Sequence, residues 1–142
     1  MRALLDVNVL IALLDAAHIH HARARDWLVQ SIDAGWASSP ITQNGCARIL
    51  SQPAYPNRIS PAQAIERLQR AARTPHHDFW ADDLSILDSE RIDGRRIHSP
   101  RHLTDVYLLA LAVKHEGRFV TFDSSIASSA VRGARGEHLV ML

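Results

Sequence analysis

The sequence predicts an α/β fold in which helices cover both faces of a parallel sheet. Short runs at residues 2–5, 118–122 and 138–142 are largely apolar and continuous. Strands buried on both faces have this character, whereas half-exposed strands alternate apolar and polar residues. Helical periodicity fills much of the chain between these runs. Helices that alternate with buried strands are typical of a parallel sheet with two helical layers.

The expected elements follow one another with short connections. We expect Asn8 to cap a first helix that runs through Leu14. Ser60-Pro61 and Ser99-Pro100 each combine a capping serine with a proline at the first helical position. The remaining predictions are helices at 20–32 and 42–50, a short strand at 36–38, and, within the less regular stretch 74–98, a strand from Phe79 and a helical turn at 84–87.

Length and composition bound the class of protein. A chain of 142 residues fits one domain, residues 1–142, with one formal positive charge that permits an anionic partner. The single cysteine, Cys46, excludes an internal disulfide and fits a reducing compartment. Asp6 and Asp15 interrupt the apolar N-terminus, so we expect no signal peptide, and no run is long enough for a membrane span. These features predict a soluble, cytoplasmic protein.

Three aspartates are the candidate functional residues. Asp6 and Asp123 each follow a predicted strand, and the carboxyl edge of a parallel sheet is where ligands bind. Asp105 precedes a strongly apolar helical stretch, 106–113, and with Pro100 opening that helix it should lie beyond the first turn. Two such charges 4 Å apart repel by about 4 kcal/mol at an effective dielectric of 20. Helix capping would explain each acid alone, but a divalent cation such as Mg²⁺ or Mn²⁺ explains all three together.

Three sequence blocks carry a resemblance to a known family. Residues 6–11, 104–112 and 121–123 resemble the corresponding blocks of PIN-domain ribonucleases, and most closely those of VapC toxins. The resemblance implies an α/β/α sandwich with about five parallel strands and a Mg²⁺-dependent endoribonuclease, with Mn²⁺ as a substitute ion, that cuts structured RNA such as tRNA or rRNA. It also implies a VapB-like antitoxin as partner and a homodimer.

The resemblance assigns roles to individual residues. Asp6 and Asp105 would be the principal metal ligands, and Asp123 would complete the site directly or through water. Asn8 would orient Asp6, while Thr104 and Thr121 would supply supporting hydroxyls.

The chain departs from the family in one respect. A glutamate usually lies on the helix after the second strand, whereas this chain has Gln43 and Asn44 there and no acid. Asp82 or Asp83 could supply the fourth carboxylate. The missing acid keeps a second hypothesis open, a catalytically weak PIN fold that binds RNA or protein. An aspartyl-phosphate phosphatase is disfavoured because Asn8 occupies the place of its second acid.

A histidine cluster stands apart from these blocks. His18, His20 and His21 lack the regular spacing of a zinc site and have no cysteine partner, so we expect surface histidines at a helix entry. No histidine forms a recognisable nucleophile motif with a serine or cysteine, which disfavours covalent hydrolysis.

Overall fold

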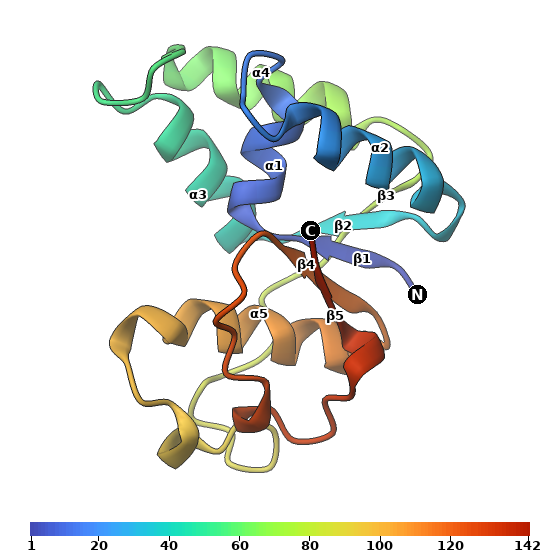
Figure 1. Cartoon of the computed structure of the whole chain (residues 1–142), viewed down its shortest axis with the longest axis vertical. Helices are drawn as coiled ribbons and strands as arrows, with labels where there is room; N and C mark the ends of the chain where they lie inside the picture. Colours follow the sequence, from blue (N-terminus) through green and yellow to red (C-terminus); the bar gives the residue numbers. More distant parts are fainter.

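The computed structural model describes residues 1–142 and contains one five-stranded sheet (Figure 1). All four strand pairings are parallel, and the strand order is β3-β2-β1-β4-β5. This confirms the α/β class and the sheet of about five strands. The strands are β1 (Ala3–Leu5), β2 (Trp36–Ser38), β3 (His77–Phe79), β4 (Arg118–Thr121) and β5 (Leu139–Met141).

The helices form unequal layers on the two faces of the sheet. Four of them pack on one face, and α5 (Leu103–Lys114) covers the other together with irregular segments (Figure 1). Each face has its own apolar core, because the central strands are buried on both sides. The four helices of the larger layer are α1 (Val7–Leu14), α2 (His21–Ser31), α3 (Pro40–Leu50) and α4 (Pro61–Ala72).

The pairing of β1 with β4 sets the position of the candidate site. Leu5 is paired with Val120, so the residues that follow, Asp6 and Thr121, leave the sheet at the same level. The backbone N–H of Asp6 donates to the carbonyl of Val120 at 2.9 Å, which ties the two strand ends together. The middle of the carboxyl edge is therefore built from these two segments.

Two predicted helix starts were wrong. Asp6, not Asn8, caps α1: its carboxylate accepts a hydrogen bond from the N–H of Val7 at 2.7 Å, so the helix begins directly after the strand. Pro100–His102 forms a separate 3₁₀ turn, and α5 begins only at Leu103. Asp105 consequently lies in the first turn of α5 and not beyond it.

The stretch 74–98 contains a short strand, but β3 ends at Phe79, where the expected strand was to begin, and residues 84–87 form no helix. Side chains hold this segment against the end of α5 instead. The ring of Trp80 stacks on that of His115 with centroids 4.5 Å apart. Asp83 pairs with Lys114 at 3.2 Å and with His115 at 3.2 Å. The segment is thus held by side-chain contacts and not by regular secondary structure, so sequence periodicity gives no signal for it.

Gly117, between α5 and β4, offers a test of the packing. A Cβ atom there would lie 2.6 Å from the carbonyl oxygen of Arg2 and 2.6 Å from the Trp80 ring. We expect Gly117→Ala to lower the free energy of unfolding by about 1–3 kcal/mol, as overpacking does, measured by urea denaturation. Gly94→Ala is the control, because nothing lies within 4 Å of a Cβ at that position. Equal stability of the two variants would contradict the prediction.

Candidate metal centre at the carboxyl edge

Asp6 is the most buried of the three candidate acids. Only 7 % of its surface is exposed. Its carboxylate accepts hydrogen bonds from the N–H of Val7 at 2.7 Å and from the hydroxyl of Thr121 at 2.5 Å. Burial nevertheless raises the pKa of Asp6 above its ordinary value, with a smaller contribution from the charge of Asp123. The side chain is therefore held in place by two hydrogen-bond donors although its burial disfavours the ionised form.

Thr121 connects Asp6 with the segment that carries Asp123. While its hydroxyl donates to Asp6, its oxygen accepts from the amide of Asn8 at 3.3 Å and from the N–H of Asp123 at 3.0 Å. The side-chain oxygen of Asn8 accepts from the N–H of Phe122 at 3.3 Å. Asn8 thus reaches Asp6 through Thr121 and fixes the loop that follows β4.

Asp123 is held by its own turn. One of its oxygens accepts from the N–H of Ser125 at 2.8 Å and from the Ser125 hydroxyl at 2.7 Å. These bonds hold the pKa of Asp123 below its usual range, and the positive groups of Arg101 and His102 lower it further. Asp123 is therefore an ionised carboxylate at the rim of the site.

The pKa of Asp105 is raised by burial and in part by the charges of the other two acids. It is half-buried in the first turn of α5, where the helix dipole would favour the ionised form. Burial, followed by the charges of Asp6 and Asp123, instead raises its pKa to about 6. No positive group is among the causes of this shift, and the pKa of Asp105 therefore reflects both its burial and the negative charges of the other two acids.

The arrangement fits an oxygen-preferring cation bound partly through water. No point in the structure has three or more His, Cys, Asp or Glu side chains placed to hold an ion directly. Mg²⁺ commonly uses only one or two carboxylates and keeps several water ligands. All candidate donors here are carboxylate, amide or hydroxyl oxygens, the chemistry that Mg²⁺ and Mn²⁺ prefer over Zn²⁺. The donor set therefore fits such an ion without requiring a closed shell of protein ligands.

Three other residues expected near the site have different surroundings. Thr104 is exposed, and its hydroxyl makes no hydrogen bond to the acids. Asp83 is committed to Lys114 and His115 at the far end of α5. Asp82 accepts from the N–H of Ile41 at 3.2 Å, at the start of α3, and its charge acts on Tyr107. Neither Asp82 nor Asp83 is among the charges that raise the pKa of Asp105.

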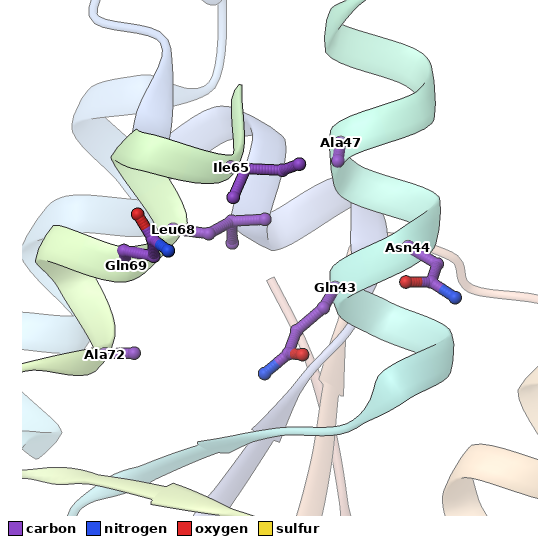
Figure 2. A pocket seen from close by; sticks show the side chains of 7 residues that line it. All are labelled: Gln43, Asn44, Ala47, Ile65, Leu68, Gln69 and Ala72. Atoms are coloured by element: carbon purple, nitrogen blue, oxygen red, sulfur yellow. The ribbon is translucent and has the colours of Figure 1, made fainter. Parts of the chain in front are cut away.

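The family usually has a glutamate on the helix after the second strand, which is α3 here. This chain has the uncharged side chains of Gln43 and Asn44 in that stretch. The amide of Gln43 donates to the hydroxyl of Ser38 at 2.9 Å, and that hydroxyl also contacts Nε2 of His77 at 2.8 Å. Figure 2 shows Gln43 directed into the space between α3 and α4, whereas Asn44 points away from that space. Gln43 thus belongs to a neutral polar network at the edge of the sheet.

Sequence reasoning missed the contribution of Ser125. The signal was present, because an aspartate followed two residues later by serine is typical of a turn in which the aspartate side chain accepts from the backbone. The nearness of Arg101 and His102 to Asp123 could not be read from the sequence. It depends on the 3₁₀ turn before α5, which local patterns did not reveal.

Comparison with known proteins places this geometry in a family. The model of the PIN domain matches residues 3–131, and the chain therefore belongs to the PIN-domain family. It is 61 % identical to Ribonuclease VapC44 of Mycobacterium tuberculosis H37Rv over 142 residues, which is 100 % of both chains. It is 42 % identical to Ribonuclease VapC39 of the same strain, over 94 % of this chain and 96 % of the relative. Within the PIN-domain family the chain thus belongs to the VapC group, as the sequence blocks predicted.

Two solved structures share the fold. VapC20 of Mycobacterium tuberculosis, described as a sarcin-ricin loop cleaving toxin, has a TM-score of 0.60 and 15 % identity, covering 94 % of this chain and 98 % of the other. VapBC2 of Rickettsia felis, bound to a DNA fragment from its promoter, has a TM-score of 0.58 and 11 % identity, covering 100 % and 98 %. At these identities the likeness supports the architecture alone.

The raised pKa of Asp105 predicts pH-dependent ion binding. Protons compete with a cation for this carboxylate, and with a pKa of about 6 the competition begins near neutral pH. We expect the apparent affinity for Mg²⁺ to fall by up to about tenfold per pH unit below the pKa, because one proton is displaced on binding. Isothermal titration from pH 7.5 to pH 5 measures this. An affinity that does not change over this range would contradict the raised pKa.

Proposed function

We propose that residues 1–142 form a single PIN-like nuclease domain that acts as a VapC-type toxin in the cytoplasm, a metal-dependent endoribonuclease that hydrolyses phosphodiester bonds of structured RNA. The proposal rests mainly on the closeness of Asp6, Asp105 and Asp123 at the carboxyl edge, where burial and the charges of the neighbouring acids raise the pKa of Asp6 and Asp105. Two relatives that match 100 % and 94 % of the chain are named ribonucleases, which supports the proposal. None of the helices combines the length and apolar character needed to span a bilayer.

The protein side chains would have two roles, binding of the ion and orientation of its ligands. Asp6 and Asp105 would hold Mg²⁺, or Mn²⁺ in its place, and Asp123 would hold it directly or through water. When bound, the ion supplies a nucleophilic water near neutral pH and stabilises the leaving oxygen. Thr121, positioned by Asn8, would keep Asp6 ionised and oriented. The expected products carry 5′-phosphate and 3′-hydroxyl ends.

A cleavage assay tests this proposal. Labelled total tRNA and rRNA are incubated with the purified chain in Mg²⁺, in Mn²⁺ and in excess EDTA. We expect discrete cuts with either ion and none with EDTA. A folded, antitoxin-free preparation that makes no cuts with either ion would contradict the nuclease. It would favour the binding-only hypothesis, with the absence of the family glutamate from α3 as its cause.

We also propose a VapB-like antitoxin as partner. A structural neighbour was solved as a VapBC complex. In this chain, an apolar hollow of about 270 Å³ lies between α1, α2 and α4, and Leu13, Leu28 and Leu68 are among its lining residues. Co-purification with the product of an adjacent small reading frame, together with loss of cleavage in the complex, would support the assignment.

A homodimer is a further part of the proposal. The space between α3 and α4 in Figure 2 has a volume of about 440 Å³ and is lined by Ala47, Ile65 and Leu68 among others. Half of the Ile65 surface is exposed there. Light scattering after size-exclusion chromatography measures the oligomeric state, and we expect Ile65→Lys to shift a dimer to monomer.

A further inference from the structure

The histidine cluster at the start of α2, formed by His18, His20 and His21, lies next to the candidate metal centre. His20 stacks on Phe122, with ring centroids 4.9 Å apart and an angle of 29° between the rings. Phe122 directly precedes Asp123, and its N–H is bonded to the side chain of Asn8 at 3.3 Å. The α1–α2 connection, which is remote in sequence from the end of β4, thus touches the segment that carries one of the three acids.

The three histidines have different roles. The Nδ1 atom of His18 accepts from the N–H of His20 at 3.0 Å, and Nδ1 of His21 contacts the carbonyl oxygen of Ala12 at 2.7 Å. Both rings therefore shape the backbone of the turn. The His20 ring makes no hydrogen bond and is exposed to solvent; it is stacked on Phe122 and lies tilted against the His18 ring, with centroids 5.8 Å apart. An exposed ring that contributes no hydrogen bond to the turn is available to a ligand.

Zinc binding does not explain this arrangement. The three histidines are not placed to hold an ion together. Stacked rings beside a phosphodiester-cleaving site suit a nucleobase, because proteins bind unpaired bases by stacking them on Phe, Tyr, Trp and His rings. Phe122 directly precedes Asp123 in the chain and His20 is stacked on Phe122, so a base that contacts these rings belongs to a nucleotide close to the cleaved phosphate.

We propose that His20 and Phe122 form a platform on which an unpaired base of the substrate RNA, adjacent to the cleaved bond, is stacked. The inference rests on the proposed ribonuclease function and specifies its substrate as RNA with an unstacked base at the cut. Phe122 supplies a fixed, half-buried ring, and His20 supplies the exposed edge of the platform. Stacking is tolerant of base identity, so the platform favours single-stranded loops and not a particular sequence.

Binding of short RNA tests the platform separately from catalysis. The probes are a fluorescently labelled 12-nucleotide oligoadenylate and an abasic oligomer of the same length, titrated in Ca²⁺ to suppress turnover. We expect His20→Ala and Phe122→Leu to weaken oligoadenylate binding by about 5- to 100-fold, the range for loss of one stacked base. The abasic oligomer should bind wild type and both variants alike. His20→Phe, which keeps a ring, should retain most of the affinity.

The controls separate this proposal from the proposed function. Ile19→Ala changes the neighbouring residue, whose side chain is 87 % exposed, and should leave affinity for both oligomers unchanged. Thermal melting checks that each variant is folded. Equal losses on the two oligomers, or no loss in either variant, would overturn the platform even if the wild type cleaves RNA. A wild type that binds neither oligomer would overturn it as well, and the metal-dependent cleavage assay on the same preparation then decides the nuclease function by itself.

Discussion

Asp105→Asn is expected to remove RNA cleavage while making the metal-free protein more stable. Cleavage should fall at least about 100-fold, because the ion contributes several kcal/mol to the transition state and loses a ligand. The stability should rise because the ionised carboxylate is disfavoured in the fold, where its pKa is raised from 3.8 to about 6. Since the side chain is only half-buried, solvent screening reduces the gain to about 1 kcal/mol.

The pH dependence of this gain has a definite sign. A raised carboxyl pKa means that the folded state binds more protons than the unfolded state between pH about 4 and pH about 6. The destabilisation is fully present above pH about 6 and disappears as the pH falls through that window. The difference in melting temperature between Asp105→Asn and wild type, both in EDTA, should therefore shrink from pH 7.5 to pH 4.5.

Asp26→Asn provides the matched control for this series. Asp26 lies on α2 with a side chain that is 67 % exposed, so its replacement should alter neither cleavage nor the pH profile. An Asp105→Asn protein that melts below wild type at pH 7.5 in EDTA would contradict the electrostatic account. Retained metal-dependent cleavage would remove Asp105 from the proposed ligands.

Thr121→Val should have the second-largest effect. Valine has the shape of threonine but removes the hydroxyl that donates to Asp6 and accepts from Asn8 and from the N–H of Asp123. Loss of a group that orients a metal ligand typically lowers metal affinity or activity by about 10- to 100-fold. The unpaired polar groups left in a fully buried position should destabilise the fold by about 1–3 kcal/mol.

Thr121→Ser separates these two effects from simple packing. Serine keeps the hydroxyl and loses only a methyl group, so it should retain most of the Mn²⁺ affinity measured by titration calorimetry. If Thr121→Ser and Thr121→Val lose affinity equally, the methyl contacts and not the hydrogen bonds would be responsible, and the orienting role would be wrong.

Local sequence signals were sufficient for most of the fold. The continuous apolar runs identified the central and terminal strands, because burial on both faces leaves few polar residues in them. The Ser60-Pro61 signal correctly located the start of α4, where the serine hydroxyl accepts from the N–H of Gln63 at 3.1 Å. One failure, the start of α1, occurred where one side chain has two local roles. Asp6 caps a helix and faces a candidate site, and a periodicity argument cannot assign both.

The site was predictable in its parts but not in its geometry. Strand ends located Asp6 and Asp123, and an acid beside an apolar helix indicated Asp105. The substitute acid was not predictable, because Asp83 is engaged by Lys114 and His115 through contacts that exist only in three dimensions. The stack of His20 on Phe122 likewise joins segments about a hundred residues apart, far beyond the span of local pattern reasoning.

The burial of Cys46 has a practical consequence. It is the only cysteine in the chain, it is fully buried on α3, and burial raises the pKa of its thiol to about 12. A thiol reagent can reach it only when the structure opens, since the thiolate is the reactive form and is disfavoured inside. The rate of Cys46 labelling therefore reports the opening of the helical layer in the native, tag-free protein. Slower labelling on addition of a divalent ion would reveal, without RNA and without any mutation, that ion binding and folding are linked.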